Sequence, residues 1–150
     1  MRRKDRRITN AEALSILEKG EYGVLSTASA KNEPYGVPLN YCVIDDSIYF
    51  HCALEGRKLD HIAANPRVSF CVVGKTRILP DQFGTQYECC IVEGSAAEAA
   101  GAEKQRALEG LLYKYSEAYF PEGLKYIERL KDQTRVFKIA MKSVSGKARK

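Results

Sequence analysis

The chain lacks tryptophan, has only two histidines among its 150 residues, and contains no apolar run long enough to cross a bilayer. A membrane-spanning helix needs about 20 mainly apolar residues, so the sequence predicts no membrane partner. The basic start, Met1–Arg7, is not followed by the hydrophobic core of a signal peptide. This pattern indicates a cytoplasmic protein.

Paired cysteine motifs are also absent. The five cysteines are an odd number and none of them forms a C-x-x-C pair. Adjacent residues such as Cys89 and Cys90, or His51 and Cys52, point to opposite faces of a strand and cannot easily share a ligand. We therefore predict free thiols that pack as small hydrophobic side chains in a reducing compartment, and no metal site.

The length and the 45% hydrophobic content fit one domain with a single core. The net charge is +5, and its cations gather at the two ends of the sequence: Arg2, Arg3, Lys4, Arg6 and Arg7, then Lys142, Lys147, Arg149 and Lys150. Basic proteins can bind nucleic acid, but no nucleic-acid motif and no interleaved aromatic residues accompany these cations. We therefore predict no nucleic-acid partner. A small phosphorylated ligand, or merely solvated ends, explains the charge equally well.

Alternating apolar residues predict a mainly antiparallel β protein. Three segments, 22–29, 36–44 and 47–54, follow one another at hairpin spacing and indicate a meander. Further strands are expected at 67–73, at 86–96, with Gly94 as a bulge, and at 135–144. Helices are expected after a capping box formed by Thr9 and Glu12, after Gly56, at 103–115 and at 123–131. The helix at 103–115 carries an apolar stripe of Leu108, Leu111, Leu112 and Tyr115. The predicted fold is α+β: a small barrel of six or so strands with helices.

The most informative segment runs from Tyr49 to Asp60, where a strand ends in a turn and a helix begins. Gly56 permits close approach of a ligand to the backbone, and Arg57 and Lys58 open the helix. A helix N-terminus offers free amides and a positive dipole end to a phosphate. An arginine can bind two phosphate oxygens at once, and a lysine adds a point charge. An ordinary helix start with exposed basic residues is the alternative.

Several segments together resemble the pyridoxamine-phosphate-oxidase-like flavoproteins, and within them the nitroimidazole-resistance (Nim-type) branch. The matching segments span nearly the whole chain in a specific order: 2–6, 20–23, 34–41, 48–51 running into 55–58, 65–70 and 145–147. The resemblance implies an FMN-binding split β-barrel that forms a homodimer, with one flavin at each end of the interface.

The resemblance also assigns residues to the cofactor. Arg57 and Lys58, with Gly56 in the turn, would bind the FMN phosphate. The isoalloxazine ring would be edged by the second strand of the meander, through Val37, Pro38, Leu39 and Asn40. The partner subunit's strand around 87–90 would close the site.

His51 would lie beside the ring system or the ribityl chain. It shares a strand face with Tyr49 and Ala53, opposite Ile48, Phe50, Cys52 and Leu54. Three roles stay open for this histidine: a structural residue, a catalytic proton donor with a pKa near 6.5, or a haem ligand, because some split-barrel relatives bind haem. His61, in the predicted helix, is interpreted as an ordinary surface or hydrogen-bonded histidine.

The resemblance favours an FMN-dependent oxidoreductase that reduces small electron-poor molecules of the nitroaromatic or nitroimidazole type, with NAD(P)H as a possible electron donor. The flavin would supply the redox chemistry and the protein its orientation. A non-catalytic flavin- or haem-binding sensor is the alternative. Oxidation of vitamin B6 is disfavoured, because the chain has no tryptophan and no second arginine and histidine set that matches binding of pyridoxine phosphate.

Overall fold

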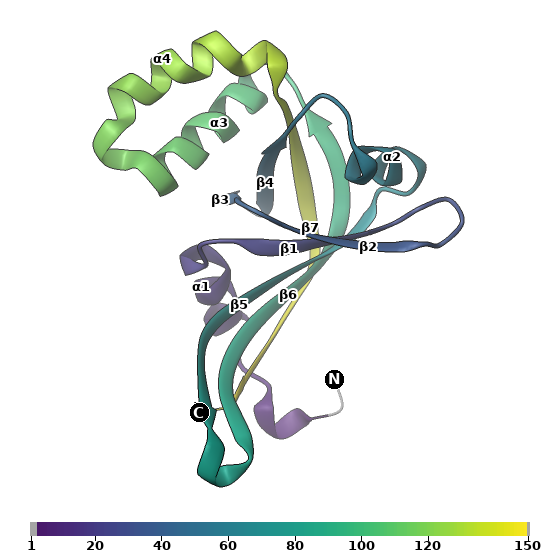
Figure 1. The fold of residues 1–150 in the computed structure, drawn as a ribbon, viewed down its shortest axis with the longest axis vertical. Helices are drawn as coiled ribbons and strands as arrows, with labels where there is room; N and C mark the ends of the chain where they lie inside the picture. Colours follow the sequence, from purple (N-terminus) through teal and green to yellow (C-terminus); the bar gives the residue numbers. More distant parts are fainter. Residues whose placement is uncertain (1–2, 150) are drawn as a thin grey trace.

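The computed structural model describes residues 3–149, in which seven strands form one antiparallel sheet that curls on itself (Figure 1). The order across the sheet is β2-β1-β5-β6-β7-β4-β3. The strands are β1 (Gly23–Ala28), β2 (Pro34–Leu39), β3 (Cys42–Ile44), β4 (Ser47–Cys52), β5 (Arg67–Leu79), β6 (Gly84–Ala99) and β7 (Arg135–Arg149). The predicted α+β class is confirmed, with one strand more than the six or so expected.

In the described part of the chain, four α-helices accompany the sheet: α1 (Asn10–Lys19), α2 (Arg57–Ala64), α3 (Gly101–Ser116) and α4 (Phe120–Leu130). The predicted capping box at the start of α1 is confirmed. The Glu12 amide donates to Thr9 Oγ1 at 3.2 Å, and the Thr9 amide donates to Glu12 Oε2 at 2.8 Å. Within residues 3–149, no helix is both long enough and apolar enough to span a bilayer.

The predicted meander is wrong in its middle strand. The segment 36–44 is not continuous: β2 pairs with β1 and β3 pairs with β4, at opposite ends of the sheet order. The chain turns at Asn40 and Tyr41, where the buried Tyr41 hydroxyl donates to the Leu17 carbonyl on α1. Alternation alone could not reveal this corner, because contacts with distant helices create it.

Two apolar clusters stabilise the fold. The larger packs the inner face of the sheet against α1 and α2, and includes Phe50 and Phe70. The smaller lies beneath α3 and α4 and includes Tyr49, only 5% exposed. Both faces of β4 are therefore largely covered. Leu54, expected with the apolar set of that strand, is instead 53% exposed in the turn that follows.

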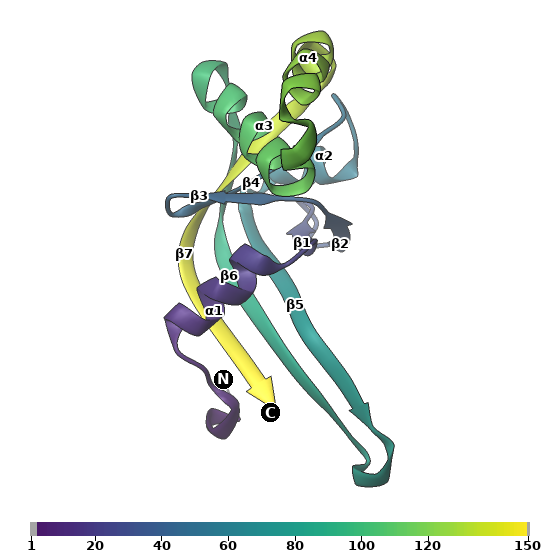
Figure 2. The ribbon, with the colours of Figure 1, turned by 90° about the vertical axis from the view of Figure 1, so that its left-hand side faces the viewer.

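Strands β5 and β6 continue well beyond the predicted 67–73 and 86–96 and form a two-stranded arm that projects from the barrel (Figure 2). Phe83 at its tip is 99% exposed. The arm was missed because both of its faces are solvated, so its residues do not alternate in polarity. The bulge predicted at Gly94 is confirmed by a register shift between Glu93 and Gly94.

The N-terminal segment and the last part of β7 both run along the lower part of the molecule, beside the arm (Figure 1). Arg7 forms an isolated antiparallel bridge with Lys147 on β7. The closing strand runs to Arg149, five residues past the predicted end at 144. Basic residues that are far apart in the sequence therefore share one surface.

Candidate functional site

The turn between β4 and α2 leaves backbone donors free. Gly56 has a φ of 143°, a conformation that side-chain-bearing residues rarely adopt, and the space where a Cβ would stand is empty. The Leu59 and Asp60 amides both donate to the Gly56 carbonyl, at 2.8 and 3.2 Å. No acceptor within residues 3–149 takes the Arg57 or Lys58 amide, as expected of the first helical positions.

Two cations stand at this helix start without a carboxylate partner. Arg57 is exposed and Lys58 is half-buried, and neither forms an ion pair with any residue that the structure describes. The Arg57 guanidinium lies 4.7 Å from the centroid of the Tyr35 ring on β2. Free amides, the positive end of the helix dipole and two cations are features that favour an anionic group at this turn.

His61 holds the helix in place beneath this site. Its ring is only 6% exposed, and its Nδ1 is hydrogen-bonded to Thr27 Oγ1 on β1 at 3.0 Å. The Tyr35 ring packs edge-on against it, with centroids 5.9 Å apart. Of the two interpretations of this histidine, the hydrogen-bonded one is confirmed. No pattern in the sequence indicated that Thr27 and Tyr35 would contact this histidine.

Arg135 fixes the other side of the turn. Its Nε and Nη2 donate to the two Glu98 carboxylate oxygens at 2.9 and 2.5 Å, and its Nη1 donates to the Leu54 carbonyl at 3.3 Å. The bound guanidinium lowers the pKa of Glu98. Sequence reasoning missed this pair, because the two residues are 37 positions apart on neighbouring strands.

His51 is exposed at the end of β4. Desolvation by the surrounding protein, and then the nearby Lys58 ammonium, lower its pKa below the ordinary 6.5. The imidazole is therefore mainly neutral at pH 7, which suits a hydrogen-bond partner or a ligand better than a proton donor. The neighbouring Cys52 is buried, and burial raises the pKa of its thiol, so a nucleophilic role is disfavoured.

Strand β2 carries the predicted flavin-ring residues away from this turn. Val37 and Leu39 are half-buried, while Pro38 and Asn40 are exposed. At about 3.3 Å per residue, Asn40 lies roughly 17 Å along the strand from Tyr35. The structure thus brings Arg57 and Lys58 to one end of β2 and places Asn40 at the other.

The Asn40 end of β2 is held by a tyrosine that the sequence did not single out for this role. The Tyr115 hydroxyl accepts from the Tyr41 amide at 3.1 Å, and the Glu21 and Tyr41 carbonyls lie within its donor range at 2.7 and 3.0 Å. Asn40 Nδ2 also donates to the Glu21 carbonyl, at 3.3 Å. Tyr115 was expected only as part of the apolar stripe of α3, yet its hydroxyl fastens this corner.

The model of the pyridoxamine 5′-phosphate oxidase family matches residues 9–148, nearly the whole chain. The chain belongs to this family. Among curated protein sequences, none matches it significantly.

Solved structures with the same fold include three informative ones. A proposed 5-nitroimidazole antibiotic resistance protein from Bacteroides thetaiotaomicron is 19% identical, with a TM-score of 0.77 over 95% of this chain and 86% of that one. An FAD-binding protein from Mesorhizobium loti is 23% identical, with a TM-score of 0.69 over 97% and 98%. An FAD- and haem-binding protein from Mycobacterium smegmatis is 15% identical, with a TM-score of 0.78 over 95% and 73%. At these identities the likeness establishes the split-barrel fold.

Proposed function

We propose that this protein binds FMN, with the phosphate on the turn that precedes α2. The observation that carries the proposal is the unpaired Arg57 and Lys58 beside the free amides after Gly56. Arg57 binds two phosphate oxygens while its guanidinium rests on Tyr35. Val37, Pro38 and Leu39 on β2, with Asn40 just beyond it, would edge the isoalloxazine ring.

We further propose a flavin-dependent oxidoreductase whose substrates are small electron-poor compounds of the nitroaromatic type, with NAD(P)H as the electron donor. Bound flavin supplies hydride and electron transfer. The chain itself binds and orients the cofactor. His51, uncharged at pH 7, hydrogen-bonds at the ring or ribityl region and takes up a proton only in acid.

The proposal includes a homodimer in which the partner's 87–90 strand closes each flavin site. The outward face of β5 and β6 supports it, because apolar side chains remain partly uncovered there: Cys71 and Ile91 are half-exposed and Val73 is exposed. Exposed apolar area of this kind marks association surfaces. A monomer that keeps its flavin on a sizing column with light-scattering detection contradicts the shared site.

The activity is tested with the purified, FMN-loaded protein. NADPH or NADH should bleach the yellow colour under anaerobic conditions, and addition of a nitroimidazole should restore it with loss of the nitro absorbance. Bleaching without reoxidation by any nitroaromatic compound leaves a flavin carrier and overturns the enzyme proposal.

Haem is the second candidate ligand, favoured by one observation: an exposed, mainly neutral histidine at the rim of the barrel, His51. Neutral imidazole is an iron ligand. Titration with haemin distinguishes the two. If the protein does not retain FMN but shows a Soret band with haemin, and if His51→Phe abolishes that band, the protein binds haem and the flavin proposal is wrong.

A further inference from the structure

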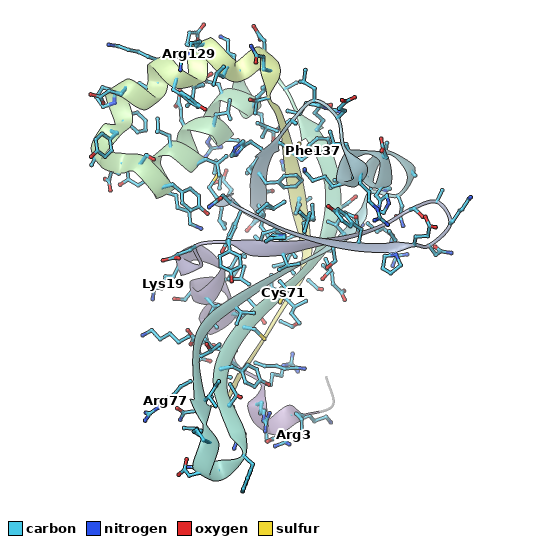
Figure 3. All side chains as sticks on the ribbon, in the orientation of Figure 1. Arg3, Lys19, Cys71, Arg77, Arg129 and Phe137 are labelled. Atoms are coloured by element: carbon cyan, nitrogen blue, oxygen red, sulfur yellow. The ribbon has the colours of Figure 1, made fainter. Side chains whose placement is uncertain are left out.

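The lower end of the molecule gathers basic residues from three segments of the chain. We call this surface the basic pole; it comprises Lys4, Arg6, Arg7, Lys75, Arg77, Lys147 and Arg149. In the part of the chain that the structure describes, none of these seven side chains forms an ion pair. Figure 3 labels Arg77 on the arm and Arg3, which is paired with Asp5, at this end. Like charges held together repel one another, and an anionic ligand relieves that repulsion.

A cavity of about 520 Å³ opens within the pole, between the arm and the end of β7. Lys75, Arg77 and Arg149 contribute cations to its wall, Tyr87 an aromatic ring and Glu88 a carboxylate. The volume lies within the range of small-molecule sites, roughly 300–1,000 Å³. This cavity is separate from the turn before α2, which lies near the opposite end of the sheet (Figure 1).

Two of the wall residues are held in place. The Arg149 guanidinium packs directly against the backbone of Gly84, where a Cβ would collide with it. Glu88 Oε1 accepts a hydrogen bond from the Lys75 amide at 3.1 Å, across the register shift between Val73 and Thr76. One Glu88 oxygen is thus occupied by the protein, and the second has no partner within residues 3–149.

We propose that this cavity binds a nucleotide with two or more phosphates, at a site apart from the FMN phosphate turn of the same chain. Tyr87 and Glu88 belong to the 87–90 strand that closes the partner's flavin site in the proposed dimer, so the nucleotide would lie beside that flavin. Arg77, Arg149 and Lys75 contact the phosphates through charge-assisted hydrogen bonds, which are stronger than those between neutral groups. Tyr87 offers its ring to the base. The free Glu88 oxygen accepts from a ribose hydroxyl, as acidic residues do in other nucleotide sites.

The three kinds of side chain together favour a nucleotide over its alternatives. Free polyphosphate would use the cations but gain nothing from an aromatic ring, and Glu88 would repel it. A nucleic-acid strand needs a track of cations with stacking surfaces along it, whereas here one half-buried tyrosine lies within a single cavity.

The experiment is calorimetric titration of the full-length, FMN-loaded protein with ATP in the absence of magnesium. Arg77→Gln with Arg149→Gln should weaken ATP at least tenfold. Lys125→Gln with Arg129→Gln, exposed on α4, removes the same charge and should change the affinity less than twofold. If the two double variants weaken ATP binding equally, the effect comes from net charge and the proposed site is wrong. The proposal is also wrong if the wild type does not bind ATP at millimolar concentration.

Two further measurements separate the nucleotide from its alternatives. Tyr87→Leu should weaken ATP about fivefold and leave tripolyphosphate unchanged; if ATP is unaffected, the site recognises phosphate alone and the proposal is wrong. A single-stranded oligonucleotide that displaces ATP at equal nucleotide concentration assigns the pole to nucleic acid and overturns it.

The flavin spectrum keeps this proposal separate from the proposed flavin function. Retention of FMN by the Arg77→Gln, Arg149→Gln protein supports a second site. If FMN and ATP binding are lost together, the pole belongs to the flavin site of a neighbouring subunit, and the second site does not exist. An Arg57→Ala, Lys58→Ala protein should lose FMN and keep ATP.

Discussion

The upper end of the molecule, around α3 and α4, and the basic pole differ in how many of their cations are paired with carboxylates. Around α3, α4 and the upper part of the sheet, four of them form ion pairs at 2.5–3.1 Å: Arg106–Asp45, Lys131–Glu128, Arg135–Glu98 and Lys138–Glu103. The seven cations of the basic pole have no carboxylate partner among the described residues. The same is true of Arg57 and Lys58 at the turn before α2. Paired cations adjust stability, whereas unpaired ones of a single sign leave positive potential for a ligand to neutralise.

The sharpest way to break this comparison is to reverse the unpaired charge at the turn. Arg57→Glu with Lys58→Glu should abolish retention of flavin through purification. The same change should stabilise the apo-protein by about 0.3–1 kcal/mol, because carboxylates suit a helix N-terminus. Absorbance at 450 nm and urea unfolding measure the two effects.

Lys125→Glu with Arg129→Glu on α4 is the matched control and should retain flavin. A destabilised apo-protein, or flavin loss in the control as well, would contradict the assignment of Arg57 and Lys58 to ligand binding rather than folding.

Removal of the Tyr115 hydroxyl tests how much an uncharged hydrogen bond contributes to stability at the upper end of the molecule, compared with the ion pairs there. Tyr115→Phe should lower the free energy of unfolding by about 1–2 kcal/mol, because it leaves the partly buried Tyr41 amide without its acceptor. Tyr113→Phe, exposed on the same helix, should cost less than about 0.5 kcal/mol. Equal costs for the two variants, measured by urea unfolding, would show that the corner at Tyr41 does not depend on this hydroxyl.

The ion pair between Arg135 and Glu98 should contribute only weakly to stability, because the two side chains are 32% and 45% exposed and solvent screens their charges. The pKa of Glu98 lies below its ordinary 4.5 in the folded protein. The contribution is therefore full above pH 4.5 and is lost as the pH falls through the folded pKa. The stability difference between the wild type and Arg135→Gln should shrink in acid; a difference that grows below pH 4.5 contradicts the pair.

Added salt should have the smallest effect on the stability of the protein, and this effect should come from the basic pole rather than from the paired cations around α3 and α4. Screening relieves repulsion at the basic pole, so a rise from 20 to 300 mM NaCl should raise the Tm of the apo-protein by about 1–2 °C. Arg77→Gln with Arg149→Gln should reduce that gain, and Lys131→Gln, which removes one exposed ion pair, should not. Equal salt responses in both variants would place the repulsion elsewhere.

What the sequence could predict is governed by local interactions. The Thr9 capping box and the Gly94 bulge depend on neighbouring residues and are confirmed. The glycine and the two cations of the turn before α2 could also be read directly, because they are consecutive. The family was recognisable for a related reason, since its segments keep their order along the chain.

The rest depends on contacts between distant segments. The break at Tyr41 comes from hydrogen bonds to α1 and α3, and the support under Arg57 comes from Tyr35, His61 and Thr27 on three elements. The basic pole also depends on contacts between distant segments. The sequence shows cations at its two ends, and β7 runs back beside the N-terminal segment and brings these ends together.

The central claim is that Arg57 and Lys58 bind the phosphate of FMN, and the ratio of FMN to riboflavin affinity tests it most directly. Riboflavin carries the same ring and ribityl chain without the phosphate. Two charge-assisted hydrogen bonds contribute about 1.5–3 kcal/mol each, so the wild type should bind FMN at least 100-fold more tightly than riboflavin. In Arg57→Ala with Lys58→Ala this preference should fall below about threefold, with riboflavin affinity unchanged. A double variant that keeps the full preference for FMN contradicts the account.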